Sequence, residues 1–316
     1  MNKIITALTL YITFLTGHSQ NLKLYMDQNT HKFGFKDPNG KTIIPAKYDY
    51  AGEFKEGFSA VELNSKCGFI NTAGKLIIPL KYEETYNFNY GRAAFKLNGK
   101  WGFIDNLGKE IIPPEYDSVN EFSDELAPVK LNNKYGFINK FGKIIIPLKY
   151  DRVTNFSEKL AAVKLNKKWG FIDYTDKLII PIEYESADSF YEGLASIKSN
   201  GKYGFTDKSG NLIIPPKYEA VERFSKGFAE VKLNKKRGIV NNLGKEIIPI
   251  KYDQVSSFSE GLIAVRTNGK WGFLDMSGTE VIPIIYENVS GFRKGVSKVR
   301  LNGQYLAIDK TDKQIK

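Results

Sequence analysis

The sequence predicts an all-β protein built from tandem repeats of 34 residues. Gly34, Gly68 and Gly102 begin a series of glycines that recurs every 34 residues up to Gly272, and proline and tyrosine recur with the same period. A fixed period of this length marks a tandem array of supersecondary units. β-Branched and aromatic residues fill each repeat and no stretch shows helical periodicity, so we expect three short strands per repeat.

The repeat that begins at residue 126 illustrates the first two strands. Residues 126–131 and 134–139 are strand-like runs, and asparagine recurs between such runs, as at Asn132. In four repeats glycine follows this asparagine, as in Asn98-Gly99. Asn-Gly between two strands predicts a hairpin with a type I′ turn, because both central residues of that turn need a positive φ.

The third strand is expected at residues 144–146. The second strand ends in Asp or Asn, and glycine usually follows three residues later, which is typical of a type I turn. Pro147 lacks a backbone donor, so we expect it at the end of the third strand, at a sheet edge. The periodic glycine of the second strand, such as Gly136, is expected to allow close approach of a neighbouring aromatic ring.

Eight full repeats and a partial ninth, which stops before its third strand, follow from this pattern. Repeats of this kind form either an open β-repeat array, or solenoid, or a closed β-propeller. Propeller blades have four strands and about 40 or more residues. The shorter repeat therefore favours the open array, with the closed propeller as the alternative.

The first 19 residues differ from the repeats. Lys3 precedes an apolar run over residues 4–15, and small residues at 17 and 19 suit cleavage before Gln20. This pattern predicts a signal peptide at 1–19 and a repeat array at 20–316, with an uncleaved anchor as the alternative. We expect export to the periplasm, the cell surface or the medium, with no later membrane span. Cys67, the only cysteine, cannot form an intrachain disulfide.

The sequence offers little material for catalysis. His18 and His31 are the only histidines, so histidine-based triads and metal sites are not expected. A periodic acidic row runs from Asp49 to Glu287, and we interpret it as a structural device that accepts backbone N–H groups or pairs with lysines. We expect a protein that is not an enzyme and needs no cofactor or metal.

The hairpins offer a better candidate site. A two-residue turn at Asn98-Gly99 places Lys96 opposite Trp101 on one face. The same pairing gives the candidate binding residues Trp101, Tyr135, Trp169, Tyr203, Trp271 and Tyr305, with Lys96, Lys130, Lys164, Lys198, Arg266 and Arg300. The ring position also holds Cys67 and Arg237, a range of volume and charge that a buried site rarely accepts. We therefore expect partly exposed rings, with packing between repeats as the competing interpretation.

The motifs Trp101-Gly102-Phe103 and Trp169-Gly170-Phe171, each preceded by lysine and followed by Ile-Pro and Tyr-Asp/Glu, resemble the bacterial WG-repeat family. The likeness covers residues 22–309. Departures are Cys67, Arg237 and Leu306-Ala307, which break the motif in their repeats. The resemblance implies a β-repeat protein with no assigned reaction.

Charge narrows the class of partner. The formal net charge of +11 favours acidic partners. Rings interleaved with cations suit an anionic polysaccharide or cell-envelope polymer, and they also suit single-stranded nucleic acid. Expected export disfavours nucleic acid. The alternative is a structural scaffold that binds another protein and no small ligand.

Overall fold

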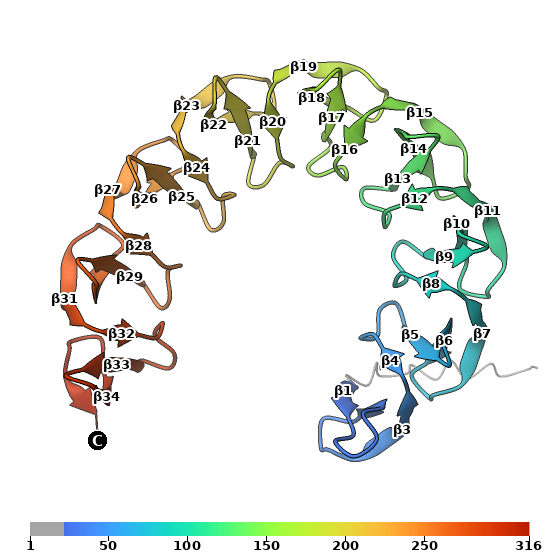
Figure 1. Ribbon diagram of the computed structural model, residues 1–316, viewed down its shortest axis with the longest axis horizontal. Coiled ribbons are helices and arrows are strands. Elements are labelled where there is room, and N and C mark those ends of the chain that lie inside the picture. Colours follow the sequence, from blue (N-terminus) through green and yellow to red (C-terminus); the bar gives the residue numbers. More distant parts are fainter. Residues whose placement is uncertain (1–21, 316) are drawn as a thin grey trace, which may run out of the picture. The chain divides into compact units, whose positions relative to one another are not determined.

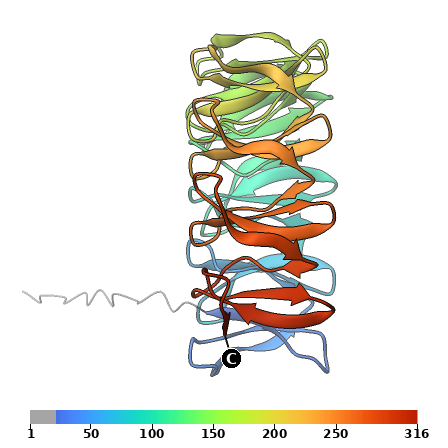
Figure 2. The ribbon, with the colours of Figure 1, turned by 90° about the vertical axis from the view of Figure 1, so that its left-hand side faces the viewer.

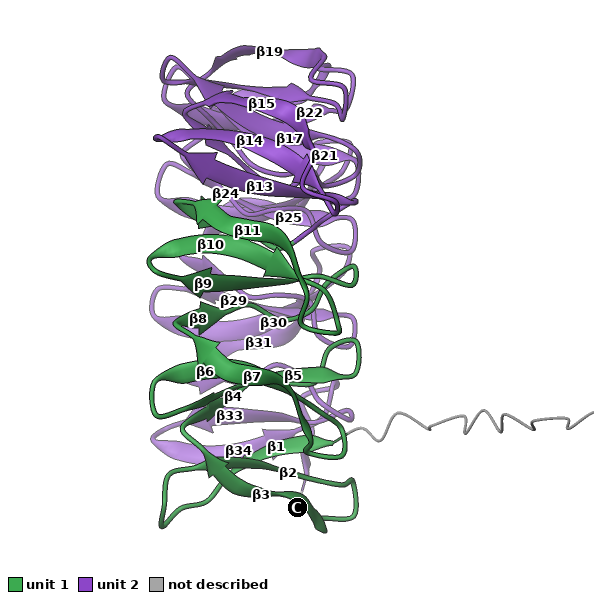
Figure 3. Ribbon diagram, turned by 90° about the vertical axis from the view of Figure 1, so that its right-hand side faces the viewer, with its two compact units in different colours: residues 1–121 green, residues 122–316 purple. Residues whose placement is uncertain are grey.

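The computed structural model describes residues 22–315, and all regular elements among them are β-strands. The chain forms two compact units: unit 1 ends at Glu121 and unit 2 begins at Phe122 (Figure 3). The predicted signal peptide lies outside the described residues. Across residues 22–315, no helix long and apolar enough to cross a membrane is found.

Each repeat contributes three main strands. The first strands are β1 (Lys23–Met26), β5 (Phe58–Leu63), β9 (Ala93–Leu97), β13 (Leu126–Leu131), β17 (Ala161–Leu165), β21 (Leu194–Ser199), β25 (Phe228–Leu233), β29 (Leu262–Thr267) and β33 (Ser297–Leu301). The second strands are β2 (Phe33–Lys36), β6 (Lys66–Asn71), β10 (Lys100–Ile104), β14 (Lys134–Asn139), β18 (Lys168–Ile172), β22 (Lys202–Asp207), β26 (Lys236–Asn241), β30 (Lys270–Asp275) and β34 (Gln304–Ile308). The third strands are β3 (Thr42–Tyr48), β7 (Leu76–Tyr82), β11 (Glu110–Tyr116), β15 (Ile144–Tyr150), β19 (Leu178–Tyr184), β23 (Leu212–Tyr218), β27 (Glu246–Tyr252), β31 (Glu280–Tyr286) and β35 (Gln314–Ile315).

A fourth, two-residue strand was not expected from the sequence. These short strands are β4 (Tyr50–Ala51), β8 (Glu84–Thr85), β12 (Ser118–Val119), β16 (Arg152–Val153), β20 (Ser186–Ala187), β24 (Ala220–Val221), β28 (Gln254–Val255) and β32 (Asn288–Val289). Strand β16 follows β15 after one residue, yet it pairs with β17 of the next repeat. The link between two repeats therefore also completes the sheet of the second one.

The sheets follow chain order within each unit (Figure 1). Unit 1 contains the sheets β1–β3, β4–β7 and β8–β11, and unit 2 contains β13–β15 followed by β16–β19, β20–β23, β24–β27, β28–β31 and β32–β35. Figure 2 shows the later sheets of unit 2, in yellow to red, as separate layers. No pairing of described strands links the first sheet of a unit to its last, so the predicted open β-repeat array is confirmed for each unit.

The predicted hairpin turns are confirmed. Asn98 and Gly99 have φ values of 50° and 74°, as a type I′ turn requires, and Leu97 pairs with Lys100. Asn166 and Lys167 also have positive φ values, so the turn persists where glycine is absent. The ninth repeat reaches further than predicted, because β35 adds a two-residue third strand to β34.

The third strand differs from two expectations, which concern its end and the role of the periodic glycine. Strand β15 continues through Pro147 to Tyr150, because it is an edge strand in which the missing proline N–H needs no partner. The pairing register shifts beside Gly136, where an added Cβ would lie 2.4 Å from the carbonyl oxygen of Ile146. The glycine therefore makes room for the backbone of the third strand, not for an aromatic ring.

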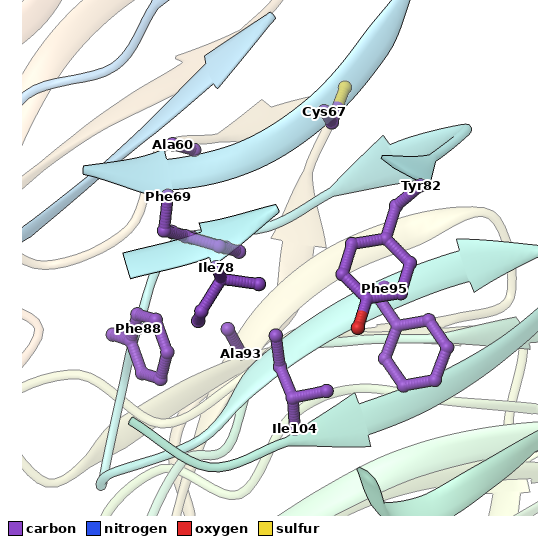
Figure 4. Packing of buried hydrophobic residues seen from close by; sticks show 9 residues of the cluster. All are labelled: Ala60, Cys67, Phe69, Ile78, Tyr82, Phe88, Ala93, Phe95 and Ile104. Atoms are coloured by element: carbon purple, nitrogen blue, oxygen red, sulfur yellow. The ribbon is translucent and has the colours of Figure 1, made fainter. Parts of the chain in front are cut away.

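Hydrophobic clusters join consecutive repeats. In unit 1, Phe69 and Tyr82 of the sheet β4–β7 pack with Phe88, Phe95 and Ile104 of the next repeat (Figure 4). In unit 2, the rings of Phe171 and Phe190 pack with their centroids 4.9 Å apart. Because each sheet covers the apolar side of its neighbour, the repeats depend on one another for burial.

The acidic row accepts backbone N–H groups and pairs with lysines, as predicted, and in doing so it also joins repeats. Asp151 accepts a hydrogen bond from Lys134 Nζ at 2.6 Å and another from the backbone N–H of Asn166, in the next hairpin, at 2.9 Å. Asp253 makes the corresponding contacts with Lys236 and Asn268. The hydrogen bond from Lys134 lowers the pKa of Asp151. These carboxylates have structural partners on both sides, which confirms the structural interpretation.

Candidate binding surface

The predicted pairing of rings and cations is present in the structure. Trp169 on β18 lies opposite Lys164 on β17, and the lysine Nζ lies 5.8 Å from the ring centroid. The other distances from cation to ring centroid are 5.7 Å for Lys96–Trp101, 5.7 Å for Lys130–Tyr135, 5.1 Å for Lys198–Tyr203, 6.0 Å for Arg266–Trp271 and 5.7 Å for Arg300–Tyr305. The two-residue turn sets this register, and a cation–π contact stabilises each exposed pair by about 0.5–1 kcal/mol.

Five of the six predicted rings reach solvent, and all five belong to unit 2. Tyr135, Trp169, Tyr203 and Trp271 are half-buried, whereas the side chain of Tyr305 is exposed. Trp169 and Trp271 also touch the hydrophobic clusters of their repeats. Each of these tryptophans therefore combines a packing role with a partly open surface, as the varied ring position led us to expect.

Trp101, in unit 1, departs from this expectation. Only 5% of its surface is exposed, because the ring of Tyr86 lies over it with the two centroids 4.7 Å apart. In unit 2 the equivalent of Tyr86 is a shorter, non-aromatic residue, such as Thr154 or Ser256. The partner of Trp101, Lys96, forms an ion pair of 2.6 Å with Glu84. The pair Lys96–Trp101 is thus a packing element rather than an open site.

The cations of unit 2 differ in their ion pairing. Arg300 lies 3.3 Å from the carboxylate of Glu287. Among the described residues, Lys130, Lys164 and Lys198 make no ion pair with a carboxylate, although each covers a ring. Three successive repeats therefore present a half-buried ring together with an ammonium group that an anion could approach.

Nothing in the described structure suggests a metal centre or a reactive thiol. No group of three or more His, Cys, Asp or Glu side chains that could hold a metal ion occurs within residues 22–315. Cys67 is buried, and burial raises the pKa of its thiol, which disfavours the nucleophilic thiolate.

Comparison with known proteins gives one family and a shared fold. A family model described as "WG containing repeat" matches eight successive segments, at residues 33–67, 68–101, 101–135, 135–169, 169–203, 203–236, 238–271 and 271–305. No curated protein matches the chain.

Solved structures resemble the chain only in fold. A structure titled "Crystal structure of the eukaryotic initiation factor" is similar over 93% of this chain and 94% of that chain, with 9% sequence identity and a TM-score of 0.53. BamB from Moraxella catarrhalis is similar over 84% of this chain and 95% of that chain, with 9% identity and a TM-score of 0.37. At such identities the likeness carries no information about ligands.

Proposed function

The chain belongs to the family of proteins that contain WG repeats, and we propose that it is a non-catalytic binding protein that recognises anionic polysaccharide through unit 2. We call the proposed site the aromatic–cation surface. It consists of Tyr135, Trp169, Tyr203, Trp271 and Tyr305 with Lys130, Lys164, Lys198, Arg266 and Arg300.

One observation carries this proposal: half-buried rings and cations without ion pairs recur together in successive repeats. A flat ring suits the apolar face of a sugar, and an ammonium group attracts its carboxylate or sulfate. A polymer that spans several repeats gains avidity, because each further contact forms within an existing complex. The net charge of +11 adds a general attraction for polyanions.

The proposed location follows from the sequence of residues 1–19. We propose export to the periplasm, the cell surface or the medium, where envelope polysaccharides are available as partners and nucleic acid is not the expected one.

The charge requirement can be tested with dextran sulfate as the probe and neutral dextran as its control. The triple variant Lys130→Met, Lys164→Met and Lys198→Met keeps the apolar stems but removes three charges beside the rings. Lys143→Met, Lys177→Met and Lys245→Met remove the same charge from exposed, equivalent positions of three repeats, which lie one and two periods apart. We expect the first set to weaken binding at least about tenfold and the second to change it much less. Equal losses of affinity in the two triple variants would mean that dextran sulfate is attracted by the general positive charge and not by the aromatic–cation surface.

A scaffold that binds another protein is the second candidate, and the packing of Trp169 and Trp271 against the core favours it. The double variant Trp169→Ala and Trp271→Ala separates the two candidates. If the rings bind polysaccharide, affinity for dextran sulfate falls in a folded variant. If they only pack, the melting temperature falls while affinity stays unchanged.

A further inference from the structure

We propose that unit 2 holds a pocket for a small carboxylic acid with an apolar body, in the repeat that carries Arg237. A cavity of about 800 Å³ lies between strands β25 and β26 and the segment 256–261 of the next repeat. Phe228, Ile239, Phe258 and Met276 provide apolar lining, and Glu230 and Arg237 provide a charged wall. This volume falls within the range typical of small-molecule sites.

Three departures from the repeat pattern meet at this cavity. Arg237 occupies the position of the ring in the WG motif. Glu230 replaces the small residue found in the neighbouring repeats, Ser196 and Ala264, and Ile239 replaces their phenylalanine. Glu230 and Ile239 are paired across β25 and β26, and Arg237 is two residues from Ile239 on the same face. The three departures from the repeat pattern therefore lie together on one face of β25 and β26.

The change at Ile239 explains the opening. In the adjacent repeats a phenylalanine of the second strand packs against a phenylalanine of the next repeat: the ring centroids are 4.7 Å apart in Phe205–Phe224 and 5.0 Å apart in Phe273–Phe292. Both second rings, Phe224 and Phe292, are buried, whereas Phe258 remains half-buried beside the smaller Ile239. An apolar surface is thus left open to a ligand.

The charges favour one negative group on that ligand. Arg237 Nη1 donates to Glu230 Oε1, so this pair is balanced. The carboxylate of Glu260 is also occupied, by the backbone N–H groups of Lys294 and Gly295 and by Lys310 Nζ at 3.1 Å.

The lining itself holds three carboxylates and the three cations Arg223, Lys226 and Arg237. Because Lys310, outside the lining, neutralises Glu260, the cavity has one excess positive charge. The planar guanidinium of Arg237 matches a carboxylate in shape as well as in charge. Among the described residues Arg237 donates to Glu230 only through Nη1, so its other N–H groups can still bind an anion, which the charges of Arg223 and Lys226 attract. An apolar acid would place its body on Phe258 and Ile239 and its carboxylate at these N–H groups.

The test uses 2-naphthoate as the probe and the uncharged 2-naphthamide as its control. The chain has three methionines. Of the two that the structure describes, Met276 lines the cavity and Met26 does not. With ¹³C-labelled methionine methyl groups, we expect 2-naphthoate to shift the NMR signal of Met276 saturably and to leave Met26 in unit 1 unchanged. 2-Naphthamide should bind more weakly. Absence of the Met276 shift, or equal binding of both probes, would overturn the proposal.

Two variants locate the ligand. Ile239→Phe restores the usual residue and fills the cavity, so affinity for 2-naphthoate should fall at least about tenfold without loss of the folded circular dichroism spectrum. The double variant Glu230→Ala and Arg237→Met removes the ion pair without a change in net charge, and it should reduce the preference for naphthoate over naphthamide, because the N–H groups that bind the carboxylate are lost. The double variant Lys81→Met and Glu110→Ala, which removes an exposed ion pair in unit 1, is the matched control. Unchanged affinity in Ile239→Phe, or unchanged preference in the double variant, would contradict the assignment.

Discussion

At the level of single residues, the buried tyrosines show how one position decides whether a hydroxyl has a partner. Tyr150 Oη donates to Asp176 Oδ1 at 2.6 Å, across 26 residues. The corresponding partner position of Tyr218 is Gly244, and the hydroxyl of Tyr218 is buried without a hydrogen bond. An unsatisfied buried hydroxyl costs about 1–3 kcal/mol. This repeat thus tolerates an unpaired tyrosine hydroxyl, which a carboxylate at position 244 would satisfy.

Gly244→Asp should raise the free energy of unfolding by about 1 kcal/mol, because a hydrogen bond to a charged group outweighs the strain of a positive φ. Asp176 already adopts this conformation, with a φ of 66° against 78° for Gly244. Gly244→Ala, which brings the strain without the acceptor, should lower the same quantity by about 1 kcal/mol. Urea unfolding of the two variants measures both effects. An aspartate variant no more stable than the alanine variant would disprove this account.

At the level of the element, the close crossing of the second and third strands limits what the sheet accepts. An added Cβ on Gly204 would lie 2.3 Å from the carbonyl oxygen of Ile214, a contact with backbone that cannot move aside easily. The glycine of the hairpin turn, Gly201, has open space around it and a φ of 72°. The two glycines of one hairpin therefore serve different physical needs.

Gly204→Ala should lower the free energy of unfolding by more than about 3 kcal/mol, since strands β22 and β23 must separate to admit the methyl group. Gly201→Ala should cost only about 1 kcal/mol, which reflects its positive φ. Thermal and urea unfolding compare the two. Similar losses would mean that the strand crossing adapts more readily than the close contact implies.

The sequence was sufficient to predict the structural elements that short local patterns encode. Asn-Gly and the alternation of residues 126–131 predicted the hairpins and the pairing of Lys164 with Trp169. The short strand Arg152–Val153 is too brief to carry a periodic pattern. The burial of Trp101 beneath Tyr86 depends on a contact between strand β10 and the residue that follows β8. The cavity at Arg237 depends on side-chain volumes at three separate positions. None of these leaves a local signal.

At the level of the whole molecule, titratable groups bound the pH range of stability on both sides. Hydrogen bonds from lysine lower the pKa of Asp49 and Asp253, as of Asp151. Burial raises the pKa of Tyr116 to about 12. Burial, followed by the hydrogen bond to Asp176, raises that of Tyr150. The two sets act at opposite ends of the pH scale.

The melting temperature should therefore be level between about pH 4 and pH 10 and fall on either side. Carboxylates with a lowered pKa stabilise the fold at a pH above their pKa in the unfolded chain. This stabilisation is lost as the pH falls through their pKa in the folded protein. Tyrosines with a raised pKa stabilise the fold below about pH 10. This stabilisation is lost as the pH rises through their pKa in the folded protein. Thermal unfolding from pH 2 to pH 12 tests both limits, and Tyr150→Phe should reduce the alkaline fall. A melting temperature constant to pH 12 would contradict the role of the tyrosines.

The two-residue strand between repeats bears on how such a gene can change. Strand β16 is provided by the residues that leave one repeat, and every later joint of unit 2 is made in the same way by β20, β24, β28 and β32. A duplication or deletion of 34 codons would consequently place equivalent residues next to each other, so each two-residue strand would still pair with the first strand of the following repeat. Unequal recombination could lengthen or shorten the protein by whole repeats, and no new type of contact between repeats would be needed.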